Sequence, residues 1–283
     1  MPIEPVTRRA FLAATGGLVA VAAVAGPAGA GRLFKNGALS PVVLSSDLYA
    51  SPDPQRLAFA IYKGSKPSSS GSAKLALAPP GATKGTVYAT TLQTAGLPKG
   101  RGVYVADALL PTAGVWKALA ITGGKRVPFA VQVNAQPVAP AVGAPAPRAA
   151  SPTRADTLGV KPICTRTPPC PLHTVSLSEV IGTGRPVAVL FATPALCQSQ
   201  YCGPVLDELL KIKGSYEDRV TFVHVEIYRS TTGAELAPTV QAWGLESEPW
   251  LYTVDGAGSI VGRLDGAFGG DEMAAQLDAL VGA

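Results

Sequence analysis

The sequence predicts two domains, an all-β sandwich followed by an α/β domain built on a central mixed sheet. Three observations predict this. Short runs of alternating apolar residues, separated by turn residues, extend from about residue 39 to residue 133. A stretch rich in Pro, Ala and Ser follows at residues 136–160. Beyond it, apolar strand patterns alternate with helical patterns.

Residues 1–30 have the pattern of an export signal. Arg8 and Arg9 precede an uncharged apolar run that leads to a small-x-small cleavage site at Ala28-Gly29-Ala30. This pattern is typical of a Tat-type signal peptide. The apolar run stops at Gly26-Pro27, short of the roughly 20 residues that a membrane span needs. We therefore expect cleavage after Ala30 and a secreted or cell-envelope location. An uncleaved signal is the alternative, and it would be the chain's only membrane association.

Composition limits the classes of partner. Hydrophobic residues make up 47% of the chain, which is ample for buried cores, and the net charge of +5 comes from scattered Lys and Arg. A basic block that would indicate nucleic-acid binding is missing, so we expect no nucleic-acid partner. All 4 cysteines follow residue 160, and an exported chain meets an oxidising environment in which paired cysteines persist.

Residues 31–135 are expected to form the sandwich. Clusters of Ser, Pro, Asp and Gly separate the strands, and Trp116 is expected to anchor the core. This number and spacing of short strands favours an immunoglobulin-like (Ig-like) sandwich. The seven expected strands are 42–44, 57–62, 74–78, 86–92, 102–110, 114–121 and 127–133.

Residues 136–160 lack hydrophobic periodicity and are expected to form a semi-extended linker. The second domain is then expected over residues 161–283. Its first helix should follow the capping box Ser176-Leu-Ser-Glu179. The remaining expected elements are a strand at 186–191, a helix at about 199–213, a strand at 220–228, a helix at 236–243, a hairpin of 250–254 with 260–264, and a last helix after Asp271.

From Pro186 onward the chain resembles the thioredoxin superfamily. Glu248-Pro249-Trp250 lies where that fold places its cis-proline, and Pro204-Val-Leu-Asp-Glu208 is similar to the helix after a thioredoxin's active cysteines. The strings Cys-Gln-x-x-x-Cys-Gly-Pro-Val-Leu-Asp and Ser-Glu-Pro-Trp resemble exported thioredoxin-like proteins of actinobacteria. The resemblance covers under half of the chain and implies thiol–disulfide chemistry.

The cysteine spacing departs from the family's pattern. A redox thioredoxin has two residues between its active cysteines, whereas Cys197 and Cys202 have four. Counting back from Pro204 places the usual pair at Leu196 and Ser199. A second alignment takes Tyr201-Cys-Gly-Pro204 as the motif and requires a longer loop before the helix. Either the helix begins after Cys197 and the two cysteines close a ring, or they are not partners.

The resemblance implies a role for each residue near this loop. Cys197 is expected to be the nucleophile, Cys202 the resolving cysteine and Pro249 the substrate-positioning residue, while Trp250 and Tyr201 are expected to contact the substrate. Leu190 occupies the place of the buried acidic residue of thioredoxins and cannot relay a proton.

Cys164 and Cys170 are expected to form a disulfide that ties the linker to the second domain. An electron relay with Cys197 and Cys202 is the sharper alternative. The string Cys170-Pro-Leu-His173 also suggests a metal ligand set, but the chain has only 2 histidines and the usual ligand spacings are missing. We therefore expect no metal and no cofactor. His224 and Glu226 share a face of a predicted strand and are expected to form a hydrogen-bonded pair.

Two functions from different classes follow. The first is thiol–disulfide exchange on exported proteins, with protein substrates or a protein redox partner. The second is a non-catalytic binding or scaffold protein that keeps the fold and uses its disulfides structurally. Copper or other metal handling is a third, weaker possibility.

Overall fold

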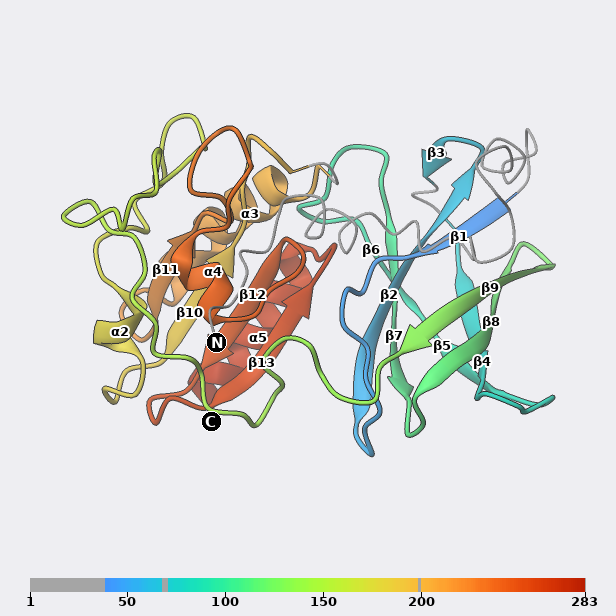
Figure 1. The fold of residues 1–283 in the computed structure, drawn as a ribbon. Coiled ribbons are helices and arrows are strands. Elements are labelled where there is room, and N and C mark those ends of the chain that lie inside the picture. Colours follow the sequence, from blue (N-terminus) through green and yellow to red (C-terminus); the bar gives the residue numbers. More distant parts are fainter. Residues whose placement is uncertain (1–38, 68–70, 198–199, 283) are drawn as a thin grey trace. The chain divides into compact units, whose positions relative to one another are not determined.

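The computed structural model describes residues 39–67, 71–197 and 200–282, and these residues divide into two compact units between Pro137 and Val138. Figure 1 shows the N-terminal unit in blue to green and the C-terminal unit in yellow-green to red. The predicted signal at residues 1–30 lies outside the described residues. None of the described helices is both long and apolar enough to cross a bilayer.

The N-terminal unit consists of two antiparallel sheets. One sheet has the strand order β1-β2-β7-β6, with β3 paired to β2, and the other has the order β5-β4-β8-β9. The strand bounds are β1 Leu39–Val43, β2 Pro54–Lys63, β3 Lys66–Pro67, β4 Ala73–Ala78, β5 Thr86–Ala89, β6 Thr91–Gln93, β7 Val103–Leu109, β8 Gly114–Thr122 and β9 Lys125–Val133.

Alternating burial explains this architecture. Along β8, Trp116, Ala118 and Ala120 are buried while Val115 is exposed, so one face of the strand enters the core. Buried side chains of both sheets, Phe59 of β2 among them, form one cluster. The prediction of a domain rich in antiparallel strands is confirmed. The expected strand at 86–92 is in fact two strands, β5 and β6, which pair with different sheets.

The segment expected to be a free linker is packed on the C-terminal unit. Ala139 and Ala146 are buried in that unit's core cluster, and Ala146 N–H donates to the Gly258 carbonyl at 2.9 Å. The Ser151 hydroxyl accepts a hydrogen bond from the Leu177 N–H at 2.9 Å. The composition of residues 136–160 predicted a semi-extended linker. Small Ala and Pro side chains, however, also suit a segment whose backbone pairs with a folded surface.

The C-terminal unit is built on a four-stranded sheet of order β11-β10-β12-β13. β10 is parallel to β11 and antiparallel to β12, so the sheet is mixed, as predicted. The bounds are α2 Leu177–Val180, β10 Val187–Phe191, α3 Cys202–Ile212, the 3₁₀ turn η2 Lys213–Ser215, β11 Thr221–Val225, α4 Pro238–Ala242, β12 Trp250–Val254, β13 Ile260–Asp265 and α5 Gly270–Gly282.

Every residue of β10 is buried, as expected for a central strand that is covered on both faces. Val187, Val189 and Phe191 point into the core that includes Val240 of α4 and Trp243. α5 packs against β12, β13 and α3. The cysteine loop leaves from the end of β10, which is a central strand of the sheet.

Candidate functional site

Cys197 and Cys202 form a disulfide at the start of α3. Their Cα atoms are 5.9 Å apart, within the ordinary range for a disulfide. The helix begins at Cys202, later than the expected Ser199, so Cys197 lies in the loop before it. This is the first of the two arrangements that the spacing allowed.

The loop between β10 and α3 is compact. The Thr193 carbonyl accepts hydrogen bonds from the N–H groups of Leu196 and Cys197 at 3.2 and 3.1 Å. The Thr193 hydroxyl in turn accepts the Ile227 N–H at 2.9 Å, which holds the loop against the chain that follows β11. These bonds fix the segment between the end of β10 and Cys197.

The two sulfur-bearing residues differ in exposure. Cys197 is half-buried, whereas Cys202 is fully buried at 0% exposure. The backbone N–H of Cys202, at the first position of α3, donates to Cys197 Sγ at 3.3 Å. An N–H at a helix start favours negative charge on its acceptor. The more exposed residue of the pair therefore also carries the sulfur that the helix terminus would stabilise as a thiolate.

A cis peptide joins Glu248 to Pro249, immediately before β12. The thioredoxin resemblance placed a cis-proline at this position. The Glu248 carboxylate lies beside the disulfide, with its Oε2 atom 3.3 Å from Cys202 Sγ. The same oxygen accepts the Thr193 N–H at 2.8 Å. The side chain of Glu248 thus connects the cysteine loop to the proline turn.

Glu248 is the residue that sequence reasoning missed. Leu190 is fully buried and apolar, as expected, so the usual acidic position carries no proton acceptor. Glu248 is 5% exposed and brings a carboxylate to Cys202 from a different strand end. The sequence did contain a signal for this role, because Glu248 is an acidic residue directly before the predicted cis-proline. Only the proline was assigned a role from the sequence.

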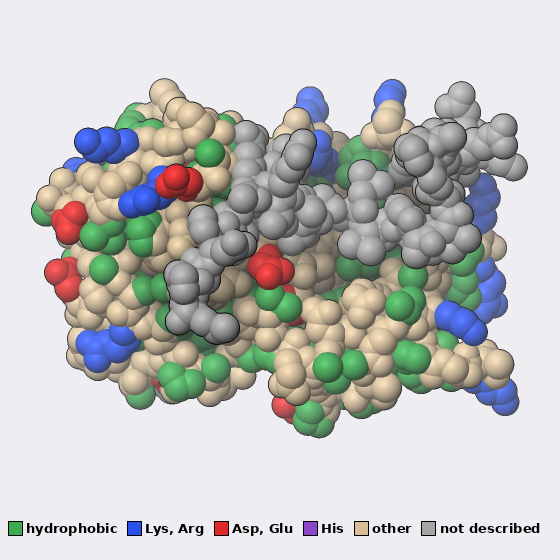
Figure 2. Space-filling model, viewed as in Figure 1, with side chains coloured by type: hydrophobic (Ala, Val, Ile, Leu, Met, Phe, Trp, Pro, Cys, Tyr) green, Lys and Arg blue, Asp and Glu red, His purple; other side chains and the backbone are tan. Residues whose placement is uncertain are grey.

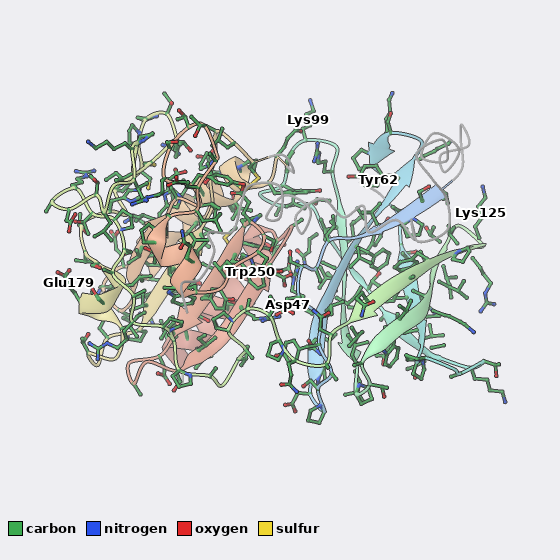
Figure 3. All side chains as sticks on the ribbon, viewed as in Figure 1. Asp47, Tyr62, Lys99, Lys125, Glu179 and Trp250 are labelled. Carbon is green, nitrogen blue, oxygen red and sulfur yellow. A yellow bond between two sulfur atoms is a disulfide. The ribbon has the colours of Figure 1, made fainter. Side chains whose placement is uncertain are left out.

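Trp250 and Tyr201 do not form the expected substrate wall. Trp250 is 1% exposed, and its indole N–H donates to the Ser247 carbonyl at 3.0 Å. Its ring stacks on Tyr252, and Figure 3 shows it among the packed side chains of the C-terminal unit. Tyr201 is 3% exposed. Both aromatic side chains are thus packing residues, because burial removes the surface that a substrate would touch.

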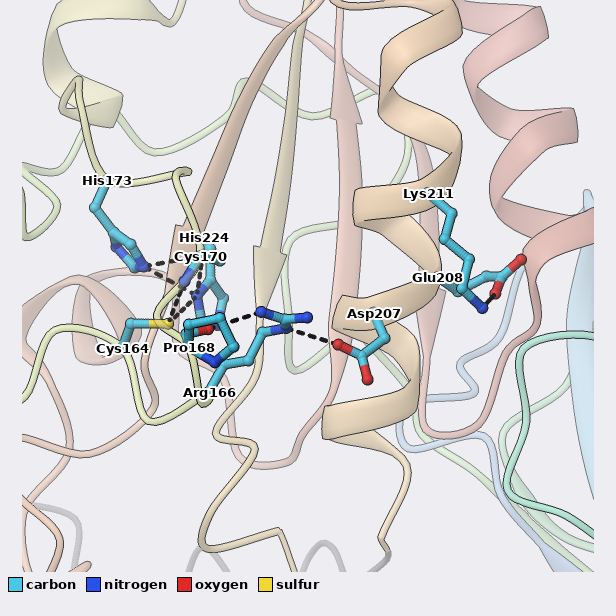
Figure 4. Close-up of polar contacts among 9 residues, drawn as sticks. All are labelled: Cys164, Arg166, Pro168, Cys170, His173, Asp207, Glu208, Lys211 and His224. Carbon is cyan, nitrogen blue, oxygen red and sulfur yellow. Dashed lines mark hydrogen bonds and ion pairs between the residues drawn. The ribbon is translucent and has the colours of Figure 1, made fainter.

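The predicted disulfide between Cys164 and Cys170 is wrong. Both residues are free and buried, and they lie in one cluster with His173 and His224 (Figure 4). Cys170 Sγ is 3.3 Å from His173 Nε2 and 3.4 Å from His224 Nδ1. The hydrogen bond from Cys170 lowers the pKa of the Cys164 thiol far below its usual range, and the same bond raises the pKa of Cys170.

His224 and Glu226 were expected to form a hydrogen-bonded pair, but each has other hydrogen-bond partners. His224 lies among the cysteines, whereas the Glu226 carboxylate accepts the Thr165 N–H at 2.6 Å. Burial raises the pKa of Glu226. Each side chain therefore holds its own part of the loop that carries Cys164 and Cys170.

Figure 2 shows the charged side chains on one face of the molecule. Its Lys and Arg side chains lie in separate groups, with Asp and Glu between some of them. No histidine is visible there, in agreement with the exposures of 1% and 0% for His173 and His224.

Comparison with known proteins identifies the C-terminal domain. Residues 174–280 match the family model of a thioredoxin-like domain, so the C-terminal α/β unit is thioredoxin-like. Among curated proteins, none matches the chain.

Two solved structures resemble part of the chain. A protein described as a thiol:disulfide interchange protein DsbE from Chlorobium tepidum has 18% identity and a TM-score of 0.36, covering 50% of this chain and 96% of its own. A thioredoxin-like superfamily protein has 14% identity and a TM-score of 0.31, covering 38% and 86%. Scores of this size carry no argument about activity.

Proposed function

We propose that this chain is an exported thiol–disulfide oxidoreductase that acts on protein substrates or a protein redox partner through Cys197 and Cys202. One observation carries the proposal. The disulfide at the start of α3 joins a half-buried residue, Cys197, to a fully buried one, Cys202, and a carboxylate lies beside the Cys202 sulfur. A purely structural disulfide would need neither the difference in exposure between the two cysteines nor the neighbouring carboxylate.

Cys197 is the attacking residue in this proposal. Cys197 is the more exposed residue of the pair, and its sulfur accepts the N–H of the first residue of α3. Because the thiolate is the nucleophile in exchange, both features favour reaction at Cys197. Cys202, which is enclosed, resolves the mixed disulfide.

The exchange is balanced in two steps. With the pair reduced, the Cys197 thiolate attacks a substrate disulfide, and the substrate's second sulfur leaves as a thiolate. Cys202 then gives its proton to the Glu248 carboxylate and attacks Cys197 Sγ, which releases the first substrate sulfur. The substrate gains two electrons and the Cys197–Cys202 disulfide forms. A partner dithiol returns the pair to the reduced form, and the reverse sequence oxidises a substrate dithiol.

Pro249 is the proposed substrate-positioning residue. The cis peptide before it lies at the start of β12, next to the carboxylate that contacts Cys202. Proline at this point leaves the backbone without an N–H, so the adjoining chain can offer its other polar groups to an extended peptide.

Export is proposed from the sequence. Arg8-Arg9, the apolar run and Ala28-Gly29-Ala30 support Tat-dependent export to the cell envelope or the medium. The similarity of the Ser-Glu-Pro-Trp string to exported actinobacterial proteins points the same way. We also propose that the N-terminal sandwich is an Ig-like module, on the basis of its two antiparallel sheets.

Turnover of a reporter disulfide tests the function. The full chain, supplied with a dithiol reductant, should accelerate the reduction of insulin disulfides above the rate of the reductant alone. A Cys197→Ser, Cys202→Ser double variant should return the rate to that baseline, while Cys164 and Cys170 remain in place. Equal rates with the two proteins, or no acceleration by either, would support the scaffold function instead.

A further inference from the structure

Both histidines of the chain and 2 of its 4 cysteines meet at one buried point. The residues are Cys164, Cys170, His173 and His224, with exposures of 5%, 1%, 1% and 0%. Their ligating atoms all lie within 4.8 Å of one another. Figure 4 shows the four side chains pointing toward a common centre, His224 from β11 and the others from the loop before α2.

The distances match a tetrahedral metal site. Zinc–sulfur bonds of about 2.3 Å and zinc–nitrogen bonds of about 2.05 Å place tetrahedral ligands roughly 3.3 Å apart for two nitrogens and roughly 3.6 Å apart for sulfur and nitrogen. His224 Nδ1 is 3.2 Å from His173 Nε2. Three of the four sulfur–nitrogen distances are 3.3 Å from Cys170 to His173, 3.4 Å from Cys170 to His224 and 3.9 Å from Cys164 to His224.

The surrounding contacts orient the ligand atoms. His224 Nε2–H donates to the Ala192 carbonyl at 2.9 Å, which leaves the Nδ1 lone pair facing the cluster. The Cys170 N–H donates to Cys164 Sγ at 3.3 Å, a contact that favours a thiolate. Glu226 holds the neighbouring residue, Thr165, by its N–H at 2.6 Å and by its hydroxyl at 3.0 Å.

The alternatives explain less. A Cys164–Cys170 disulfide would leave the two imidazoles with their contact to each other and with the His224 contact to the Ala192 carbonyl, but it would not use the four ligand atoms that converge here. A cluster without metal would bury four titratable groups away from water, at a cost that a divalent cation removes, because two thiolates balance its charge. Two sulfurs and two imidazole nitrogens in a tetrahedron favour zinc.

We propose that Cys164, Cys170, His173 and His224 bind a structural zinc(II) ion. The site is closed, with four protein ligands and no open position, so it serves folding rather than catalysis. It would fasten the 164–173 loop to β11. Three of the four ligands precede the matched region at 174–280, so the site belongs to this chain's own extension of the domain.

The loop that the metal would hold also contacts the disulfide loop. The Thr165 hydroxyl accepts the Ala195 N–H at 3.1 Å, and Arg166 forms an ion pair with Asp207 of α3 at 2.7 Å. The zinc proposal does not depend on the redox proposal, since a scaffold with an inert disulfide would use the same anchor.

Metal analysis of the purified full chain tests the site. We expect about one zinc ion per chain, or uptake of about one after chelation, mild reduction and addition of zinc. A Cys164→Ser variant and a His224→Asn variant should each lose at least about tenfold in zinc affinity. The matched control is Cys202→Ser, which removes a buried cysteine outside the cluster and should keep the zinc.

Cobalt binding keeps the test valid if the variants fail to fold. The unmodified chain should bind cobalt(II) with the strong visible bands of a tetrahedral site and a thiolate charge-transfer band. A Cys164–Cys170 disulfide found by mass spectrometry without reduction, or no zinc uptake after reduction, would overturn the proposal. Loss of zinc in Cys202→Ser would also overturn it.

Discussion

A Cys202→Ser variant will hold a substrate as a stable mixed disulfide through Cys197, whereas a Cys197→Ser variant will not. Cys197 is half-buried and its sulfur accepts the helix N–H, while Cys202 is fully buried. We expect capture of a reporter disulfide to be at least about 100-fold faster with Cys202→Ser, because enclosure denies the Cys202 sulfur an approach path. Non-reducing mass spectrometry of the trapped species measures the difference.

The double Cys197→Ser, Cys202→Ser variant is the control for this experiment, because it keeps Cys164 and Cys170. It should capture nothing. Equal capture by the two single variants would contradict the assigned roles, and faster capture through Cys202 would reverse them.

Replacing Glu248 with Gln is expected to slow reporter turnover about 100-fold near neutral pH. The change keeps the size of the side chain but removes the proton acceptor 3.3 Å from Cys202 Sγ. General base catalysis is worth about 10²–10⁴-fold in rate. Without the acceptor, Cys202 must lose its proton to solvent, so the deficit should shrink as the pH rises. A pH profile of turnover for both proteins measures this.

Glu246→Gln is the matched control, since Glu246 is exposed and lies two residues away. It should leave turnover within about twofold of the unmodified chain. First capture by the Cys202→Ser background should be unaffected by Glu248→Gln, because that step does not use Cys202. A uniform loss of rate at every pH, with capture lost as well, would indicate that Glu248 only supports the loop.

Much of the fold could be predicted because its signals are local. The alternation of apolar residues in β8 and the apolar run of β10 each predicted a strand. The capping box predicted α2, where the Ser176 N–H donates to the Glu179 carboxylate at 2.9 Å. The strand and helix order of the C-terminal domain led to the thioredoxin-like fold. The 138–160 segment was not predictable in this way, because its order depends on backbone partners in β13 and α2 that composition cannot reveal.

The site was only partly predictable, because it depends on contacts between distant positions. The Cys197–Cys202 pairing and the cis-proline lie close to recognisable strings. Glu248 and Cys202 are 46 residues apart, and Cys164 and His224 are 60 residues apart. Such pairs meet only after the sheet has formed. Local spacing therefore suggested a Cys164–Cys170 disulfide, and the Cys170-Pro-Leu-His173 string hinted at a metal ligand set, but nothing local placed Cys164 and His224 beside it.

The two cysteine groups also show why residue type alone decides little. Cys197 and Cys202 are disulfide-bonded, whereas Cys164 and Cys170 are free and lie beside two histidines. Their place at the start of α3 and the half-buried position of Cys197 distinguish the first pair from the second, whereas Cys202 is as buried as Cys164 and Cys170. These are properties of the folded chain.

The reduction potential of the Cys197–Cys202 couple tests the redox proposal most directly. The full chain would be equilibrated in glutathione buffers of graded potential, quenched with acid and analysed by mass spectrometry of the peptide that contains both cysteines. We predict a potential above about −250 mV, in the range of oxidoreductases. A potential below about −300 mV would mark an inert structural disulfide and contradict the proposed exchange activity.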